Sequence, residues 1–280
     1  MLKIIAIASL FILPAASAGF ISSDLELHVE EAPPIPLNEA VTIKANLNFS
    51  WGFGAIFPMP LTIYIEFENI PDWLYVSANP SSFTITPLGW RGGSVGRDFT
   101  ITFRAKDETN AFVIYNLVLK AYTNGSFLIN GAESEKAINV MQDFNDRGLT
   151  IEKAKGKVKL HESKTFYLNV TNNCNAPIVV NIQQENESKF FELSYENNQI
   201  IPSKSKKSIS FTVSAKKTGK ETIPIKITYF PTGHEERKNE AYTTITLESY
   251  ESASNIKAIS IGIIIVIIAS IIVVILKRRK

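Results

Sequence analysis

The sequence predicts an all-β protein made of two tandem β-sandwiches, followed by one C-terminal transmembrane α-helix. Apolar and polar residues alternate in successive runs between Leu25 and Leu247, as they do in strands that bury one face. No long stretch of this region has the apolar period of a helix. The run from Ala258 to Leu276 carries no charge and, at about 1.5 Å per residue, can cross roughly 30 Å of hydrocarbon.

The N-terminal segment is typical of a secretory signal peptide. Lys3 supplies a positive start, an apolar run extends from Ile4 to Leu13, and Ala16-Ser17-Ala18 fits the small-residue pattern of a cleavage site. We therefore expect residues 1–18 to be removed and the mature chain to begin near Gly19.

Residues 19–145 are predicted to form the first sandwich. Its alternating runs cover residues 25–29, 41–49, 61–67, 99–105, 115–121 and 138–141. A less regular extended segment, residues 68–87, contains Pro71, Pro80 and Pro87 and is expected at a sheet edge, because proline cannot donate to a central strand.

Residues 146–250 are predicted to form the second sandwich on the same scheme. Its alternating runs cover residues 166–170, 178–182, 209–213, 223–227 and 241–247. Extended segments near Leu149 and from Phe190 to Ile201 bring the number to about seven strands, which is typical of an immunoglobulin-like sandwich.

The strand and turn pattern of both halves resembles a known group of domains. The residues that carry the likeness are "TFYLNVTNNCNAPIVVNI", "IIPSKSKKSISFTVSA" and "KETIPIKITYF" in the second half, and "NIPDWLYVSANPSSFTITP" and "RDFTITFRAKDETNAFVIYNLVLKAY" in the first. They resemble the CARDB-like and NPCBM-associated β-sandwiches that occur in tandem on archaeal and bacterial cell surfaces. The resemblance implies extracellular, usually non-catalytic modules that bind, space or anchor, and it transfers no functional residue.

Three loops of the first sandwich are expected to meet at one end. Consecutive antiparallel strands reverse direction, so the loops at 50–60, 88–97 and 123–135 should share a surface. They carry our candidates for partner contact, which are Trp51, Phe53, Phe57, Trp90 and Arg91. The alternative is that Trp51 and Phe57 turn inward and plug the end of the sandwich.

Four Asn-x-Ser/Thr sequences are candidate glycosylation sites, at Asn48, Asn124, Asn169 and Asn186. Asn169 lies between Leu168 and Val170, which are expected to face the core, so its side chain should point outward.

The only cysteine, Cys174, lies in the predicted turn between the strands at 166–170 and 178–182. No histidine is present in that turn to activate it, so we expect a free thiol between the two domains rather than a nucleophile. An intermolecular disulfide is the alternative.

Charge and motifs argue against several classes of function. Residues 19–145 contain 7 Lys and Arg against 14 Asp and Glu, a net charge of −7, whereas residues 146–255 contain 16 against 13, a net charge of +3. Neither half has the concentrated positive charge of a nucleic-acid-binding protein. The Lys-rich segments 152–164 and 203–208 are expected to be solvated loops.

The sequence offers no motif for catalysis. His28, His161 and His234 lack metal-ligand spacing, and no nucleophile elbow or phosphate-binding loop is present. We expect no catalytic residue, no cofactor and no metal, with calcium at residues 143–146 as a minor alternative.

The predicted function follows from this organisation. We expect a single-pass type I protein of the cell membrane, with a short linker (251–257), a span in membrane lipid (258–276) and a basic cytoplasmic tail (277–280). The ectodomain would act without catalysis as a scaffold, adhesion or surface-layer anchoring module, with an extracellular protein or glycan as partner. The alternative is an accessory subunit of a membrane enzyme, transporter or secretion complex.

Overall fold

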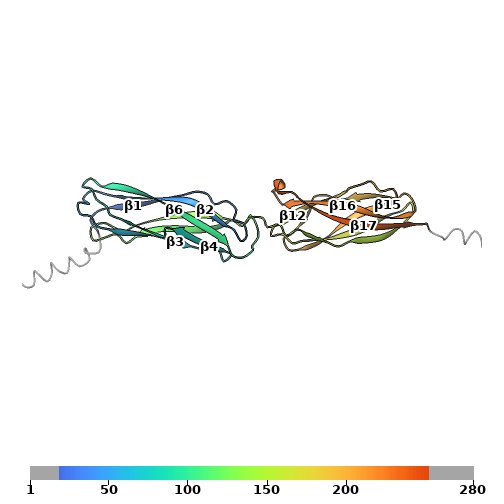
Figure 1. The fold of residues 1–280 in the computed structure, drawn as a ribbon, viewed down its shortest axis with the longest axis horizontal. Coiled ribbons are helices and arrows are strands. Elements are labelled where there is room, and N and C mark those ends of the chain that lie inside the picture. The colour runs from blue at the N-terminus through green and yellow to red at the C-terminus, as the bar shows by residue number, and fades with distance from the viewer. Residues whose placement is uncertain (1–18, 252–280) are drawn as a thin grey trace, which may run out of the picture. The chain divides into compact units, whose positions relative to one another are not determined.

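The computed structural model describes residues 19–251, which form two β-sandwiches (Figure 1). The chain divides into two compact units between Asn145 and Asp146. The expected signal peptide, transmembrane helix and cytoplasmic tail lie outside the described residues, as does all of the expected linker except Glu251. Between residues 19 and 251, the chain has no helix long and apolar enough to cross a membrane.

The first domain consists of two four-stranded antiparallel sheets. One has the strand order β1-β2-β6-β4 and the other has the order β5-β3-β7-β8. The strands are β1 (Ser23–Val29), β2 (Ala40–Trp51), β3 (Leu61–Glu68), β4 (Leu74–Asn79), β5 (Ser82–Ile85), β6 (Gly93–Ala105), β7 (Tyr115–Thr123) and β8 (Ala132–Val140). All of these strands lie between Ser23 and Val140, within the first of the two compact units.

The core of the first domain lies between the inward faces of these two sheets. Phe49 of β2 and Phe103 of β6 are fully buried, and so are Ile63 of β3 and Leu119 of β7 on the opposite sheet. The buried residues alternate with exposed ones along β2 and β6. The alternating runs found in the sequence therefore mark the strands correctly.

The segment between β3 and β6 differs from the prediction. It forms two edge strands rather than one, because β4 pairs with β6 whereas β5 pairs with β3 on the other sheet. The change of sheet occurs at Pro80, between the two strands, where the backbone has no N–H to donate. Strand β6 also begins at Gly93, so the loop expected at 88–97 ends earlier.

The second domain consists of a four-stranded sheet, β13-β15-β11-β9, and a five-stranded sheet, β10-β17-β16-β12-β14. A short 3-10 helix, η2 (Glu235–Arg237), precedes the last strand. The strands are β9 (Leu149–Ile151), β10 (Ala154–Lys159), β11 (Ser163–Asn172), β12 (Ile178–Gln184), β13 (Phe191–Tyr195), β14 (Gln199–Ile201), β15 (Lys206–Ala215), β16 (Gly219–Pro231) and β17 (Asn239–Tyr250).

The two domains repeat one topology. In the second domain, the segment between β12 and β15 again contributes one strand to each sheet, since β13 pairs with β15 and β14 pairs with β12. In the second domain β10 additionally pairs in parallel with β17. Both domains therefore have the coarse arrangement of an immunoglobulin-like sandwich.

The expectation that residues 152–164 form a solvated loop was wrong, because this segment contains β10. The alternation of apolar residues that would indicate this strand is interrupted, because Gly156 occupies a position where an apolar residue would be expected. A Cβ at this position would lie 1.9 Å from Cε1 of Phe166, so the ring occupies the space that a side chain would need. In the Lys-rich segment 203–208, the residues from Lys206 onward belong to β15.

Candidate contact surface at the tip of the first domain

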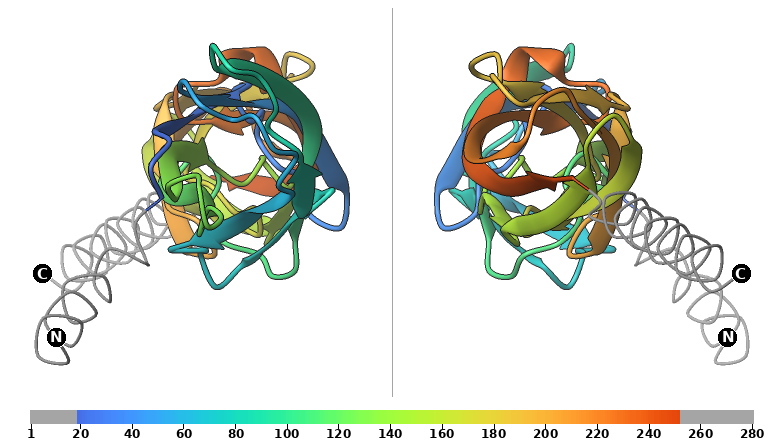
Figure 2. Two further views of the ribbon diagram at one scale, coloured as in Figure 1. Left: turned by 90° about the vertical axis from the view of Figure 1, so that its left-hand side faces the viewer. Right: turned by 90° about the vertical axis from the view of Figure 1, so that its right-hand side faces the viewer.

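Three loops and the N-terminal residues of the first domain lie at the same end of its sandwich. They are residues 19–22, 52–60, 86–92 and 124–131, which we call the tip segments (Figure 2, left). The last strand of the domain, β8, runs away from this end. The gathering of loops that strand reversal predicts is therefore present.

Backbone hydrogen bonds join the tip segments to one another. The N–H of Gly54 donates to the carbonyl of Trp90 at 3.0 Å, and the N–H of Gly89 donates to the carbonyl of Ala55 at 2.7 Å. The N-terminal residues join the third loop, since the N–H groups of Phe20 and Ile21 both donate to the carbonyl of Leu128 at 2.8 Å. The tip is thus one connected structure rather than a set of independent loops.

Large apolar side chains project from these segments into solvent. Phe20 is 79% exposed, Phe127 is 66% exposed and Trp90 is 57% exposed. The rings of Phe53 and Trp90 meet edge to face, with centroids 4.3 Å apart. The full set, which we call the apolar tip, is Phe20, Phe53, Ile56, Phe57, Leu88, Trp90 and Phe127.

Trp51 behaves differently from the other sequence candidates. It lies at the end of β2, is only partly exposed, and stacks on the buried ring of Phe49 with centroids 6.2 Å apart. Gly93 allows this position, because a Cβ there would lie 2.7 Å from Cζ2 of Trp51. Trp51 therefore closes the end of the core, whereas Phe57 is 61% exposed and does not plug the sandwich.

Sequence reasoning placed Phe53, Phe57, Trp90 and Arg91 at this end, and all four are exposed there. It missed four members of the apolar tip, which are Phe20, Ile56, Leu88 and Phe127. A usable signal for Phe127 was an apolar residue inside the Gly- and Asn-rich segment "NGSFLING".

The tip segments differ in charge from the rest of their domain. They contain no Asp or Glu, and Arg91 is their only charged side chain. The 14 acidic residues of 19–145 all lie elsewhere in the domain. The apolar tip is thus a region without negative charge on an acidic domain.

The corresponding loops of the second domain have another chemistry. They are residues 173–177, 202–205 and 232–238, which read "NCNAP", "PSKS" and "TGHEERK". None of the large exposed apolar side chains of the second domain lies in these loops. Exposure of apolar groups at the tip is therefore not a general consequence of the shared topology.

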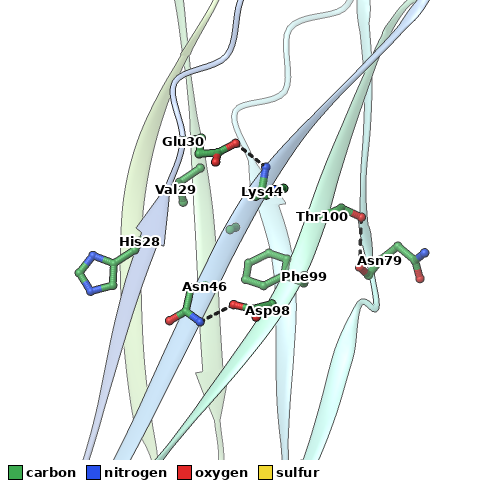
Figure 3. A pocket seen from close by; sticks show the side chains of 10 residues that line it. His28, Val29, Glu30, Lys44, Asn46, Asn79, Asp98, Phe99 and Thr100 are labelled. Atoms are coloured by element: carbon green, nitrogen blue, oxygen red, sulfur yellow. Dashed lines mark hydrogen bonds between the residues drawn. The ribbon is translucent and has the colours of Figure 1, made fainter.

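A pocket of about 780 Å³ on the outer side of the sheet β1-β2-β6-β4 is a second candidate site (Figure 3). Its polar groups largely bond to one another. Nδ2 of Asn46 donates to Oδ1 of Asp98 at 2.6 Å, and Oε2 of Glu30 accepts from the N–H of Lys44 at 3.1 Å. Because these groups already have partners within the sheet, we interpret the pocket as a solvated hollow.

The four glycosylation candidates lie in different settings. Asn124 and Asn186 are exposed in loops, whereas Asn48 and Asn169 lie within strands β2 and β11 and are partly exposed. Nδ2 of Asn169 donates to Oε2 of Glu152 at 2.8 Å, and its Oδ1 accepts from Oγ of Ser208 at 2.6 Å. A glycan on Asn169 would have to replace both bonds.

Cys174 is a free thiol that is fully buried in the turn between β11 and β12. Its Sγ donates to Oδ1 of Asp146 at 3.3 Å, and the hydroxyl of Tyr229 donates to the same carboxylate at 3.0 Å and 3.1 Å. Burial, aided by the Asp146 carboxylate, raises the pKa of Cys174 to about 11. The thiol is thus sealed within its own domain, which argues against an intermolecular disulfide.

Asp146 also belongs to the segment considered for calcium. Its carboxylate accepts from Tyr229, Cys174 and the N–H of Gly148, the last at 2.8 Å. Among residues 19–251, no group of three or more His, Cys, Asp or Glu side chains is placed to hold a metal ion.

The two tip tryptophans should differ in their effect on stability. Trp51→Ala should lower the free energy of unfolding by about 2–3 kcal/mol, because it removes a ring that covers the core. Trp90→Ala should lower it by about 1 kcal/mol or less, because it removes only an exposed ring contact. Urea unfolding followed by circular dichroism measures both, and equal losses would contradict these positions.

The buried thiol should give a pH dependence of stability above neutrality. The native state favours the protonated thiol, so its contribution is complete below pH 9.0 and is lost as the pH rises to about 11. We expect the free energy of unfolding of the wild type to fall by up to about 2 kcal/mol more than that of Cys174→Ala over this range. If the free energies of unfolding of the wild type and of Cys174→Ala fall in parallel as the pH rises, the burial of Cys174 is contradicted.

Comparison with known proteins adds little beyond the fold. No family model matches the sequence, and no curated protein matches it. Solved structures similar to the chain include a protein of unknown function from Porphyromonas gingivalis W83, with 8% identity, 79% of this chain and 99% of that chain covered, and a TM-score of 0.33. A second is PapD-like domain 7 of human CEP192, with 11% identity, 37% of this chain and 86% of that chain covered, and a TM-score of 0.32. A third comprises domains 4 and 5 of the S-layer protein SbsC, with 12% identity, 80% of this chain and 96% of that chain covered, and a TM-score of 0.29. At these TM-scores the likenesses carry no argument about function.

Proposed function

We propose that this chain is a non-enzymatic module of the cell surface that acts as a scaffold, adhesion or anchoring protein, and that the apolar tip is its contact surface. The exposure of the apolar tip is the observation that carries the proposal. Exposed apolar patches on stable soluble domains are usually small, and larger ones mark sites of interaction.

The rigidity of the tip supports the same proposal. Its side chains stand on loops that are joined by backbone hydrogen bonds and anchored by buried residues, among them Ala55 and Ile129. A surface that is ordered before binding loses less conformational entropy when it binds. Burying one large apolar side chain contributes about 1.5–3 kcal/mol, so even part of the set would give useful affinity.

The corresponding loops of the second domain provide a comparison for the apolar tip. Both domains have the same topology, yet only the first carries large exposed apolar side chains on these three loops. This difference favours a specific role for the first domain and a spacing role for the second.

The remaining parts of the proposal come from the sequence. Export by the signal peptide, anchoring by residues 258–276, glycosylation at sequons outside the tip segments and kinship with CARDB-like or NPCBM-associated surface domains all belong to it. An archaeal source and attachment to a surface layer would fit this organisation.

The proposal predicts tip-dependent binding to the source organism's own cell envelope. Purified residues 19–251 hold both complete sandwiches and should bind isolated envelopes. Phe53→Ser combined with Trp90→Ser should weaken this binding by about tenfold or more, because two exposed rings no longer become buried. A pull-down assay with quantitative blotting measures the change.

The matched control is Tyr75→Ser combined with Ile114→Ser. These residues are 61% and 58% exposed and lie at the opposite end of the same domain. The control should bind like the wild type, and a tip variant that also binds normally would contradict the proposal. If the bound envelope component is a single integral membrane complex, the accessory-subunit alternative is favoured instead.

A further inference from the structure

We propose that the apolar tip binds by inserting its side chains into the surface of a lipid bilayer that carries anionic headgroups. This inference rests on the proposed function, because it takes the tip to be the contact surface and specifies what the tip contacts. It concerns residues of the first domain that project from separate loops toward the same end.

The composition of the tip segments suits a bilayer interface. Trp, Phe, Ile and Leu on adjacent loops can enter the boundary between headgroups and acyl chains, where aromatic rings are favoured. The tip segments hold no acidic residue, although the domain that bears them has a net charge of −7. An anionic bilayer would repel the rest of the domain and attract Arg91, which selects the tip as the inserting end.

Part of the backbone of the tip is already hydrogen-bonded, which lowers the cost of entering a poorly hydrated environment. Unpaired N–H and C=O groups are costly when they leave water. The N–H groups of Gly52, Gly54 and Gly89 all donate to backbone carbonyls, at 2.9, 3.0 and 2.7 Å. In the third loop, the N–H groups of Ser126 and Asn130 donate to the carbonyls of Ile129 and Ile21, at 2.8 and 2.9 Å.

The shape of the tip favours lipid over a sugar. The pocket of Figure 3 and two smaller pockets of the first domain, one beside Trp73 and one beside Ile114, are not lined by any residue of the apolar tip. A glycan site needs polar side chains beside the aromatic rings to bond sugar hydroxyls. Two hydroxyl groups at the third loop are engaged locally, since Thr123 Oγ1 at the end of β7 accepts from the N–H of Gly125 and Ser126 Oγ accepts from the N–H of Ile129. Projecting rings can enter a fluid apolar phase directly.

The test uses residues 19–251 and vesicles of phosphatidylcholine and phosphatidylglycerol in a two-to-one ratio, with pure phosphatidylcholine for comparison. Cosedimentation should show binding to the anionic vesicles. Phe53→Ser with Trp90→Ser should reduce the partition coefficient by about tenfold or more, whereas Tyr75→Ser with Ile114→Ser should leave it unchanged.

Two further readouts separate insertion from adsorption. Brominated lipids should quench part of the tryptophan fluorescence, and this part should disappear in Trp90→Phe. Arg91→Glu should weaken binding to anionic vesicles by about fivefold or more and leave binding to pure phosphatidylcholine nearly unchanged, because it replaces a favourable positive charge near the surface with a negative one.

The outcomes distinguish this inference from the proposed function. If the chain binds cell envelopes through its tip but does not bind protein-free vesicles, the partner is a protein or glycan, and lipid insertion is overturned while the proposed function stands. If neither binding to cell envelopes nor binding to vesicles depends on the tip, both lipid insertion and the proposed function are overturned. Vesicle binding that is equal in the tip variant and the control variant also overturns lipid insertion.

Discussion

The packing of two inward-facing sheet surfaces against each other determines the rest of the first domain. Phe49 and Phe103 on one sheet and Ile63, Leu117 and Leu119 on the other are fully buried. The described residues contain no disulfide, since Cys174 is a free thiol, so this apolar interface carries the stability of the fold. Because the strands must stay in register to keep it buried, their ends align and the loops that join them meet at common ends.

This constraint explains which features the sequence could predict. The alternation of apolar residues along 41–49 and 99–105 marked β2 and β6, since each inward residue must be apolar to bury its face. Strand reversal then placed Phe53, Phe57 and Trp90 at one end without knowledge of any contact. These inferences depend only on local pattern and on the geometry of antiparallel strands.

The remaining features depend on contacts between residues that are distant in sequence. The strand signal of β10 is hidden at Gly156, which is small because the ring of Phe166 occupies its space. Whether Trp51 turns inward depends on Phe49 beneath it and on Gly93 beside it. The exposure of Phe57 and the burial of Cys174 by Asp146 and Tyr229 are likewise set by tertiary packing, which periodicity cannot reveal.

The first domain keeps a set of aromatic side chains exposed to water on an ordered tip. Hydroxyl-radical footprinting of the purified ectodomain, read by mass spectrometry, tests it most directly, because it reports the solvent exposure of individual side chains in solution. We expect rapid oxidation of Phe53, Phe57, Trp90 and Phe127 and slow oxidation of Trp51. Protection of the first four residues to the level of Trp51 would mean that the loops fold over the core, and it would contradict the exposure of the apolar tip.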